Sequence, residues 1–357
     1  MPATVQVRFE KWPKIWLIAL GCLIFSGIAL SLALPQSRVA SNSNPANAGY
    51  ADVALYQDIA QRVANGENYY TAAITEQRAH DYPLHPFVTV RLPTQALILA
   101  NFDKKFYTLA MGIIGFSAML VWGYRISEQT GRSTLAVLIV FPIMLSTTAL
   151  GFTKLDLLHE SAAALLIALA IAMRTADRFF VSALLALFAA LLRETAIAFP
   201  AMMLVLALWE KKYREATMWA IVLAIFGIVI VVHANMVAAV ISQQDLHSPG
   251  WSGLLGWAFA LDAIRSYSVL IFLPYWVTAL ILPMSLVGWL FWRAPTGLRA
   301  FGIVCGYTLM VALFARANTS YWAIMITPLL ISGSIMAVPV LGRLAGLIFA
   351  PAAVRQT

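Results

Sequence analysis

The sequence predicts an all-α integral membrane protein, and three of its features lead to this fold class. Hydrophobic residues make up 61% of the 357 residues, with a mean hydropathy of +0.80. Charged residues make up only 11%, against about 25% in an ordinary soluble domain. The apolar residues form continuous runs near the length of about twenty that crosses a bilayer, whereas a β-barrel would show alternation.

Ten apolar runs, separated by charged residues, glycines or prolines, are the candidate membrane-spanning helices. They cover residues 15–34, 106–124, 133–150, 158–173, 178–192, 195–209, 216–240, 269–291, 299–315 and 321–341. The first run is too long for the apolar core of a signal peptide and lacks a convincing cleavage site, so we count it as a span. We therefore expect residues 1–357 to form a single transmembrane domain, a bundle of about ten helices.

The charges predict how the chain is oriented in the membrane. If the N-terminus is cytoplasmic, 14 of the 24 lysines and arginines lie in the cytoplasmic segments and four in the short loops opposite. The other six lie in the long first loop, which crosses the membrane largely regardless of its charge. Both termini are therefore expected in the cytoplasm, with a bacterial inner membrane as the location. The net charge of +8 follows this topology and does not indicate a nucleic-acid partner.

The carboxylates divide in the opposite sense. Eleven of the sixteen acidic residues fall on the predicted extracytoplasmic side. This bias indicates a site that uses acids there, although acids could also simply be tolerated on that side.

The largest polar stretch, residues 35–105, is predicted as an extracytoplasmic loop between the first two spans. Within it, the sequence DVALYQDIAQRVANG at 52–66 is typical of an amphipathic juxtamembrane helix that ends at Gly66.

Asp52 is the most informative acid of this predicted helix. Helical spacing puts Asp52 and Tyr56 on the apolar stripe that should rest against the membrane domain. Asp58 falls on the opposite side, where a pair with Arg62 would explain it. Asp52 is therefore the better functional candidate, with capping of the helix N-terminus as the alternative.

A second acid cluster precedes the fourth span. Asp156 and Glu160 are four residues apart and are expected on one helical face, although Thr153 and Asp156 also fit a capping box. With Asp52, these carboxylates could hold a divalent cation, Mg²⁺ or Mn²⁺, because such ions prefer oxygen ligands.

The extracytoplasmic side also offers arginines. Arg193 joins two short apolar runs, and Arg316 lies in a later loop. The planar guanidinium group matches phosphate geometry, so both are candidate phosphate ligands. Arg193 could instead pair only with Glu194, or anchor the chain at the membrane surface.

Tyrosines and histidines of the long loop suggest less specific roles. Tyr69, Tyr70 and Tyr82 could form an aromatic wall for a sugar ring, or pack at the bilayer interface. His80 and His85 have a spacing that zinc could use, but no third ligand is evident.

These residues together resemble a known family. An Asp after the first span is followed by Y-x-x-x-A and G-x-x-Y-Y, here Asp52, Tyr56, Ala60, Gly66, Tyr69 and Tyr70. With the long first loop, an acid in the next outer loop, and LLRETAIAFP followed by the basic EKKYREA, this pattern is similar to polytopic GT-C glycosyltransferases. Val53 stands where some members carry a second acid.

The resemblance implies transfer of a sugar from a polyprenyl-phosphate donor to a glycan or lipid acceptor on the extracytoplasmic side. Asp52 would be the general base, and Asp156 with Glu160 and the divalent cation would position the donor phosphate. The lipid phosphate would be bound by Arg193 and Arg316. The substrate pocket would be lined by Tyr56, Tyr69, Tyr70, Tyr82, Glu160 and Glu194.

Two other classes stay open from the sequence. A secondary transporter or lipid flippase would need ionisable residues near the membrane midplane, and most charges here lie at the ends of the predicted spans. A non-catalytic partner in a cell-envelope complex is neither favoured nor excluded.

Overall fold

The computed structural model describes residues 5–37, 45–102, 104–131, 133–152 and 155–349, and their side chains except within 45–51 and 143–152. These residues are mainly α-helical, and within the described ranges only two isolated β-bridges occur. The expectation of an all-α protein is confirmed for this part of the chain.

Among the described residues, five helical segments are long and apolar enough to cross a membrane: Lys14–Ala33, Lys104–Thr130, Tyr213–Ala238, Pro295–Phe314 and Ala317–Phe349. Five shorter apolar helices are Ser133–Pro142, His159–Met173, Phe180–Leu192, Glu194–Trp209 and Tyr275–Phe291. Each of the ten predicted runs overlaps one of these segments. The chain is therefore an α-helical integral membrane protein, while the crossing of all ten segments stays a prediction.

Two predicted runs differ from the observed helices in their bounds. In the run 269–291, the helix begins only at Tyr275, because Pro274 has an extended backbone and the preceding residues form a separate 3₁₀ turn. The run 321–341 begins as 3₁₀ helix and becomes α-helix at Thr327. Hydrophobicity alone does not report such breaks.

The chain divides into two compact units, residues 1–42, 118–146 and 253–357 in the first and residues 43–117 and 147–252 in the second. The first unit holds α1 (Lys14–Ala33), α12 (Gly256–Ser266), η4 (Val269–Phe272), α13 (Tyr275–Phe291), α14 (Pro295–Phe314), η5 (Ala317–Ile326) and α15 (Thr327–Phe349). In it, α13 packs along α15 and α1 packs against α13.

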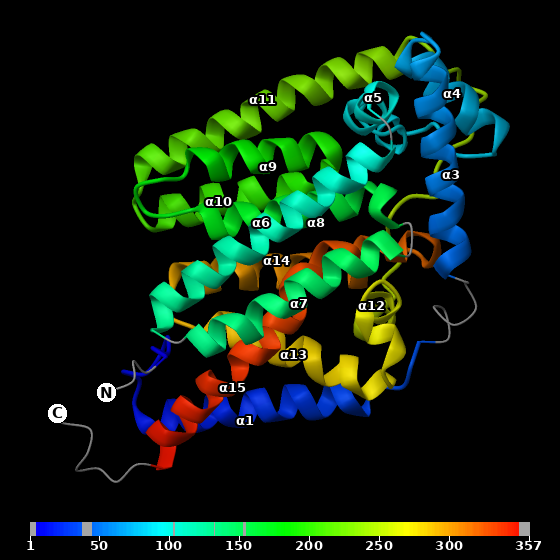
Figure 1. The fold of residues 1–357 in the computed structure, drawn as a ribbon. Helices are drawn as coiled ribbons and strands as arrows, with labels where there is room; N and C mark the ends of the chain where they lie inside the picture. The colour runs from blue at the N-terminus through cyan, green and yellow to red at the C-terminus, as the bar shows by residue number, and fades with distance from the viewer. Residues whose placement is uncertain (1–4, 38–44, 103, 132, 153–154, 350–357) are drawn as a thin grey trace. The chain divides into compact units, whose positions relative to one another are not determined.

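The second unit holds α3 (Pro45–Ala64), α4 (Tyr69–Ala79), η1 (Phe87–Thr89), α5 (Thr94–Asn101), η2 (Leu155–Leu157), α8 (His159–Met173), α9 (Phe180–Leu192), η3 (Glu194–Ile197), α10 (Ala198–Trp209) and α11 (Tyr213–Ala238). The helices α6 (Lys104–Thr130) and α7 (Ser133–Phe152) contribute to both units. Figure 1 shows α8 beside α9, α10 beside α11, and α3 beside α4. Most of the long polar stretch thus belongs to the same unit as α8–α11.

Helix α3 includes the stretch predicted to be amphipathic. Its Leu55 and Ile59 are buried in an apolar cluster with Ile74 of α4 and Val90. The turn after α3 is made by Gly66, whose φ of +92° favours glycine because it has no Cβ. Packing on this apolar face fixes which α3 side chains point away from solvent.

Candidate functional site

Asp52 lies well inside α3, which begins seven residues earlier at Pro45, so it is not the N-cap of this helix. Its carboxylate is half-buried, and Oδ1 accepts a hydrogen bond from the Tyr82 hydroxyl at 2.7 Å. Tyr82 follows α4, so the bond joins two parts of the polar stretch that are 30 residues apart.

Tyr56 lies one turn after Asp52 on α3. Its ring meets the His159 ring edge-on, with the centroids 4.4 Å apart. Its hydroxyl oxygen accepts a long hydrogen bond from Arg91 Nε at 3.5 Å. Tyr56 thereby connects α3 to the beginning of α8 and to the segment before α5.

Arg193 lies between α9 and η3 and is 2% exposed. Its Nε lies 2.6 Å from Glu160 Oε1, and its Nη1 lies 3.1 Å from Glu194 Oε2. Glu194 in turn lies 3.8 Å from Arg91 Nη1 and accepts a hydrogen bond from the Leu92 amide at 2.9 Å. The buried guanidinium group is thus compensated by two carboxylates, as burial of a charge requires.

We call these residues the α3–α9 cluster: Asp52, Tyr56, Tyr82, Arg91, His159, Glu160, Arg193 and Glu194. All belong to the second compact unit, and they come from α3, two segments of the polar stretch, the start of α8, the C-cap of α9 and the start of η3. Three carboxylates, two tyrosine hydroxyls, a histidine and two arginines therefore meet at one place in the fold.

Burial has a clear electrostatic effect on the tyrosines of this cluster. It raises the pKa of Tyr82 well above 10, and the nearby Asp52 carboxylate adds to the shift. Burial also raises the pKa of Tyr56, against the lowering effect of Arg91. Both hydroxyls therefore stay protonated at ordinary pH, and Tyr82 remains a donor to Asp52.

The phosphate-binding role predicted for Arg193 does not agree with this arrangement. A guanidinium group 2% exposed, with a carboxylate on either side, is held as the centre of an ion network. The predicted private pair with Glu194 is also incomplete, because Glu160 makes the shorter contact. Arg91 is the more accessible cation, with its side chain 19% exposed.

Arg316, the second predicted phosphate ligand, belongs to the first compact unit. It precedes η5, where its backbone amide donates to Thr319 Oγ1 at 2.8 Å. This contact is made by the backbone, so the phosphate-binding role of the Arg316 guanidinium group stays a prediction.

The expectation that Asp156 and Glu160 share a helical face is wrong. Asp156 lies in the 3₁₀ turn η2, and Leu158, with an extended backbone, separates it from α8. Asp156 Oδ2 accepts a hydrogen bond from Thr108 at 2.7 Å, whereas Glu160 pairs with Arg193. The alternative capping box involves Thr153, which lies outside the described residues.

The divalent cation predicted from Asp52, Asp156 and Glu160 does not fit these positions. The three carboxylates face three different partners: Tyr82, Thr108 and Arg193. Within the described part of the chain, the group of possible ligands whose atoms lie within 4.8 Å of one another is Asp58, Glu76 and His80. We therefore derive no step through a metal at the α3–α9 cluster.

Asp58 does not pair with Arg62, which had been expected from their spacing. Arg62 instead contacts Glu67 at 2.7 Å and Glu76 at 2.9 Å. Glu67 lies in the turn after α3, and Glu76 lies on α4. The predicted pairing was wrong because helical spacing relates residues of one helix only, whereas the acids that pair with Arg62 lie after α3 in the sequence.

The remaining aromatic candidates fix the backbone around Arg91. The Tyr69 hydroxyl donates to the Arg91 carbonyl oxygen at 2.6 Å. The Tyr70 hydroxyl lies 3.3 Å from His233 Nδ1, and His233 Nε2 lies 3.0 Å from the Val90 carbonyl oxygen. Tyr69 and Tyr70 thus position the chain, and only Tyr82 reaches Asp52 among the described contacts of these three tyrosines.

The two histidines considered for zinc lie in different surroundings. His80 Nδ1 lies 3.0 Å from the Glu76 carbonyl oxygen. His85 stacks on His247 with the ring centroids 4.3 Å apart, and its Nε2 lies 2.8 Å from the Ser242 carbonyl oxygen. The spacing of His80 and His85 therefore does not produce a shared site for both.

Sequence reasoning missed two members of the cluster, Arg91 and His159. Arg91 carries no motif; it lies in the polar stretch two residues before Pro93, the N-cap of α5. A signal did exist for the contact of Glu160 with Arg193. The two residues are equally distant from the short α8–α9 connection, and an antiparallel helix pair brings such residues together.

Comparisons of the chain with protein-family models, with curated proteins and with solved structures give no match.

Proposed function

We propose that this protein is a membrane glycosyltransferase that moves a sugar from a polyprenyl-phosphate donor to a glycan or lipid acceptor, with Asp52 as the general base. The observation that carries the proposal is the Asp52 carboxylate, half-buried and aligned by Tyr82 at 2.7 Å. A positioned carboxylate beside protonated hydroxyls and cations is what activation of an acceptor hydroxyl needs.

The acceptor oxygen bonds to the sugar carbon while the bond from that carbon to the phosphate oxygen breaks. Asp52 takes the proton of the acceptor hydroxyl, and the lipid phosphate leaves with the electron pair. Inversion at the sugar carbon is implied by the resemblance to GT-C enzymes.

The leaving phosphate carries negative charge, and Arg91 is the better placed cation to meet it. Arg91 is partly exposed, whereas Arg193 is buried between Glu160 and Glu194. In this proposal Arg193 positions the two glutamates, and Glu194 positions Arg91. Arginine binds phosphate through its planar fork.

The membrane location supports a lipid-linked substrate. A donor with a polyprenyl chain stays in the bilayer, and a protein built from apolar helices can meet it there. The rival function of transport or lipid flipping predicts no chemical change in the substrate.

The deciding experiment compares Asp52→Asn with Asp58→Asn, an exposed acid on the same helix. The glycans and glycolipids of cells lacking the protein are compared with those of cells carrying each variant. We expect Asp52→Asn to behave like the deletion, with a specific sugar missing, and Asp58→Asn to restore it. A full complement of sugars with Asp52→Asn would contradict the base assignment, and a defect in export alone would favour the transporter.

A further inference from the structure

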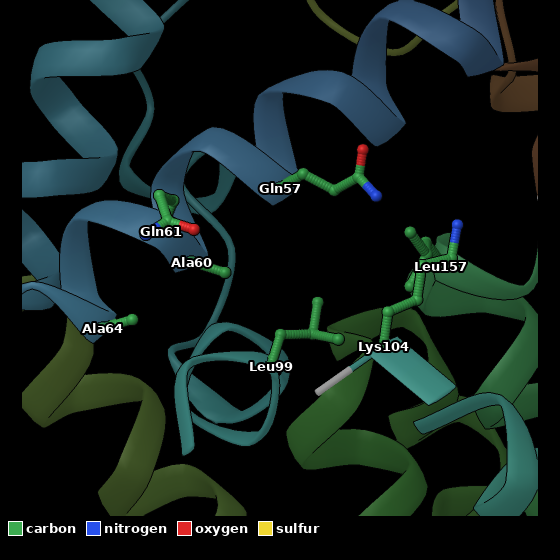
Figure 2. A pocket seen from close by; sticks show the side chains of 7 residues that line it. All are labelled: Gln57, Ala60, Gln61, Ala64, Leu99, Lys104 and Leu157. Atoms are coloured by element: carbon green, nitrogen blue, oxygen red, sulfur yellow. The ribbon is translucent and has the colours of Figure 1, made fainter. Parts of the chain in front are cut away.

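A cavity of about 260 Å³ lies in the second compact unit beside α3, and none of its described lining residues belongs to the α3–α9 cluster. The described residues that line it are Gln57, Ala60, Gln61, Ala64, Leu99, Lys104 and Leu157. Figure 2 shows Gln57 reaching from α3 toward the side of the cavity where Lys104 stands. Leu99 and Leu157 come from α5 and η2, so four segments form the walls.

The lining has the chemistry of an anion site. Lys104 is its only charged residue among those described, and Gln57 and Gln61 place two primary amides one turn apart on α3. No carboxylate and no aromatic ring belongs to the described lining. Carboxylates and aromatic rings commonly hold sugar rings, whereas a lysine with amide donors suits phosphate.

The cavity lies beside the first residue of a candidate membrane span. Lys104 is the first residue of α6, a helix of 27 residues that is apolar enough to span a membrane. Along the start of α6, Phe106, Leu109 and Ile113 are each about half exposed or more, at 48%, 62% and 58%. Such an apolar surface on a spanning helix is covered by lipid, and a lysine at its end lies at the level of the headgroups.

The size of the cavity limits what enters it. Pockets that enclose a drug-sized ligand measure about 300–1,000 Å³, so 260 Å³ holds a headgroup and not a whole lipid. The apolar part of the lining, Ala60, Ala64, Leu99 and Leu157, would contact the first carbons next to the headgroup.

We propose that this cavity binds the phosphate group of a membrane lipid, with Lys104 as its counter-ion and the Gln57 and Gln61 amides as hydrogen-bond donors. The proposal does not rest on sugar transfer, because none of the lining residues belongs to the α3–α9 cluster. It would hold equally for a transporter or an assembly partner.

The test uses the full-length protein in phosphatidylcholine nanodiscs that contain a diazirine-labelled phosphatidic acid. Crosslinked positions are mapped by mass spectrometry. We expect labelling within residues 57–64 and 99–104. We expect Lys104→Gln to reduce that labelling about tenfold, which is the usual loss when a charge-assisted hydrogen bond is removed.

Lys105→Gln is the matched control, because Lys105 is the next residue, is exposed and does not line the cavity. It should label like the wild type. Gln57→Leu, at another exposed position, should also reduce labelling while leaving the helix intact. Equal labelling of Lys104→Gln and Lys105→Gln, or equal labelling by a diacylglycerol with the same diazirine, would overturn the proposal.

Two further measurements test whether the ligand is a lipid and whether the cavity is independent of Asp52. Labelling that persists in excess inorganic phosphate is expected for a lipid ligand, whereas displacement would assign the cavity to free phosphate. Asp52→Asn should leave the labelling unchanged even where it abolishes sugar transfer. Loss of labelling with Asp52→Asn would contradict a site separate from the α3–α9 cluster.

Discussion

The Tyr82 hydroxyl donates a hydrogen bond to Asp52 Oδ1 at 2.7 Å, and this bond joins helix α3 to the segment that follows α4. Burial keeps Tyr82 protonated, since it raises the pKa of the phenol well above 10. The bond therefore stabilises the charged form of Asp52, which is the form that a general base must have.

Tyr82→Phe should shift the pH dependence of the proposed sugar transfer. Without the donor, the Asp52 carboxylate is less stabilised and its pKa rises, so the acid limb of the kcat/KM profile should move to higher pH. A hydrogen bond to a charged group contributes about 1.5–3 kcal/mol, so a shift of about one pH unit or more is expected. Tyr213→Phe, at an exposed tyrosine, is the control. If the acid limb of the Tyr82→Phe profile stays at the wild-type pH, this hydrogen bond does not act on Asp52 as the base.

Arg193→Ala should destabilise the protein strongly. It leaves Glu160, which is 2% exposed and 2.6 Å from Arg193, as an uncompensated buried charge. Breaking such a pair costs about 3–5 kcal/mol, whereas Glu160→Gln with Arg193→Gln should recover part of the loss. Melting temperatures in detergent measure both effects.

The matched control for this network is the buried pair of Arg174 and Glu215 in the same unit. Arg174→Ala should lower the melting temperature in the same way. A double variant of Arg174 and Glu215 that restores stability should keep the full proposed transfer activity. If the double variant of Glu160→Gln with Arg193→Gln also keeps the full proposed transfer activity, the Arg193 network has only a structural role.

The helices of this protein were predictable from the sequence because apolar runs are a local property. The run 216–240 corresponds to α11, Tyr213–Ala238, and the turn at Gly66 follows from the freedom of a residue without Cβ. Breaks inside runs were less predictable, because the 3₁₀ turn before Tyr275 is as hydrophobic as the helix after it.

The cluster was predictable only in part, and the reason is the path of the polar stretch. The contact of Glu160 with Arg193 follows from two antiparallel helices and a short connection. The contacts of Asp52 with Tyr82 and of Arg91 with Glu194 depend on irregular segments whose course no periodicity records. Helical spacing also misled at Asp58, since Arg62 takes its partners from residues beyond the helix.

The ion pair of Arg78 with Asp245 should make the local stability depend on pH. Asp245 accepts two hydrogen bonds from Arg78 at 2.7 Å, and these lower the pKa of its carboxyl far below the usual 3.8. Because the folded pKa is the lower one, the stabilisation is fully present above about pH 4 and is lost as the pH falls through the folded pKa.

We therefore expect Asp245→Asn to unfold or exchange more readily than the wild type near pH 7, by at most about 1 kcal/mol because Arg78 is partly exposed. The difference should shrink below pH 4. Hydrogen exchange of α4, measured from pH 7 to pH 3, reports it. A difference that grows on acidification would have the wrong sign for this ion pair.

Gly288→Ala should destabilise the first compact unit, although alanine is the better helix former by about 1 kcal/mol. A Cβ at Gly288 would meet the Gly333 carbonyl oxygen and the Ala337 amide nitrogen, both backbone atoms of α15. Helices in membranes pack closely where small residues let their backbones approach, and overpacking costs about 1–3 kcal/mol. Gly306→Ala is the control, because nothing lies within 4 Å of a Cβ there. The melting temperature in detergent should fall for Gly288→Ala and hold or rise for Gly306→Ala. Equal behaviour of the two variants would contradict the close packing of α13 on α15.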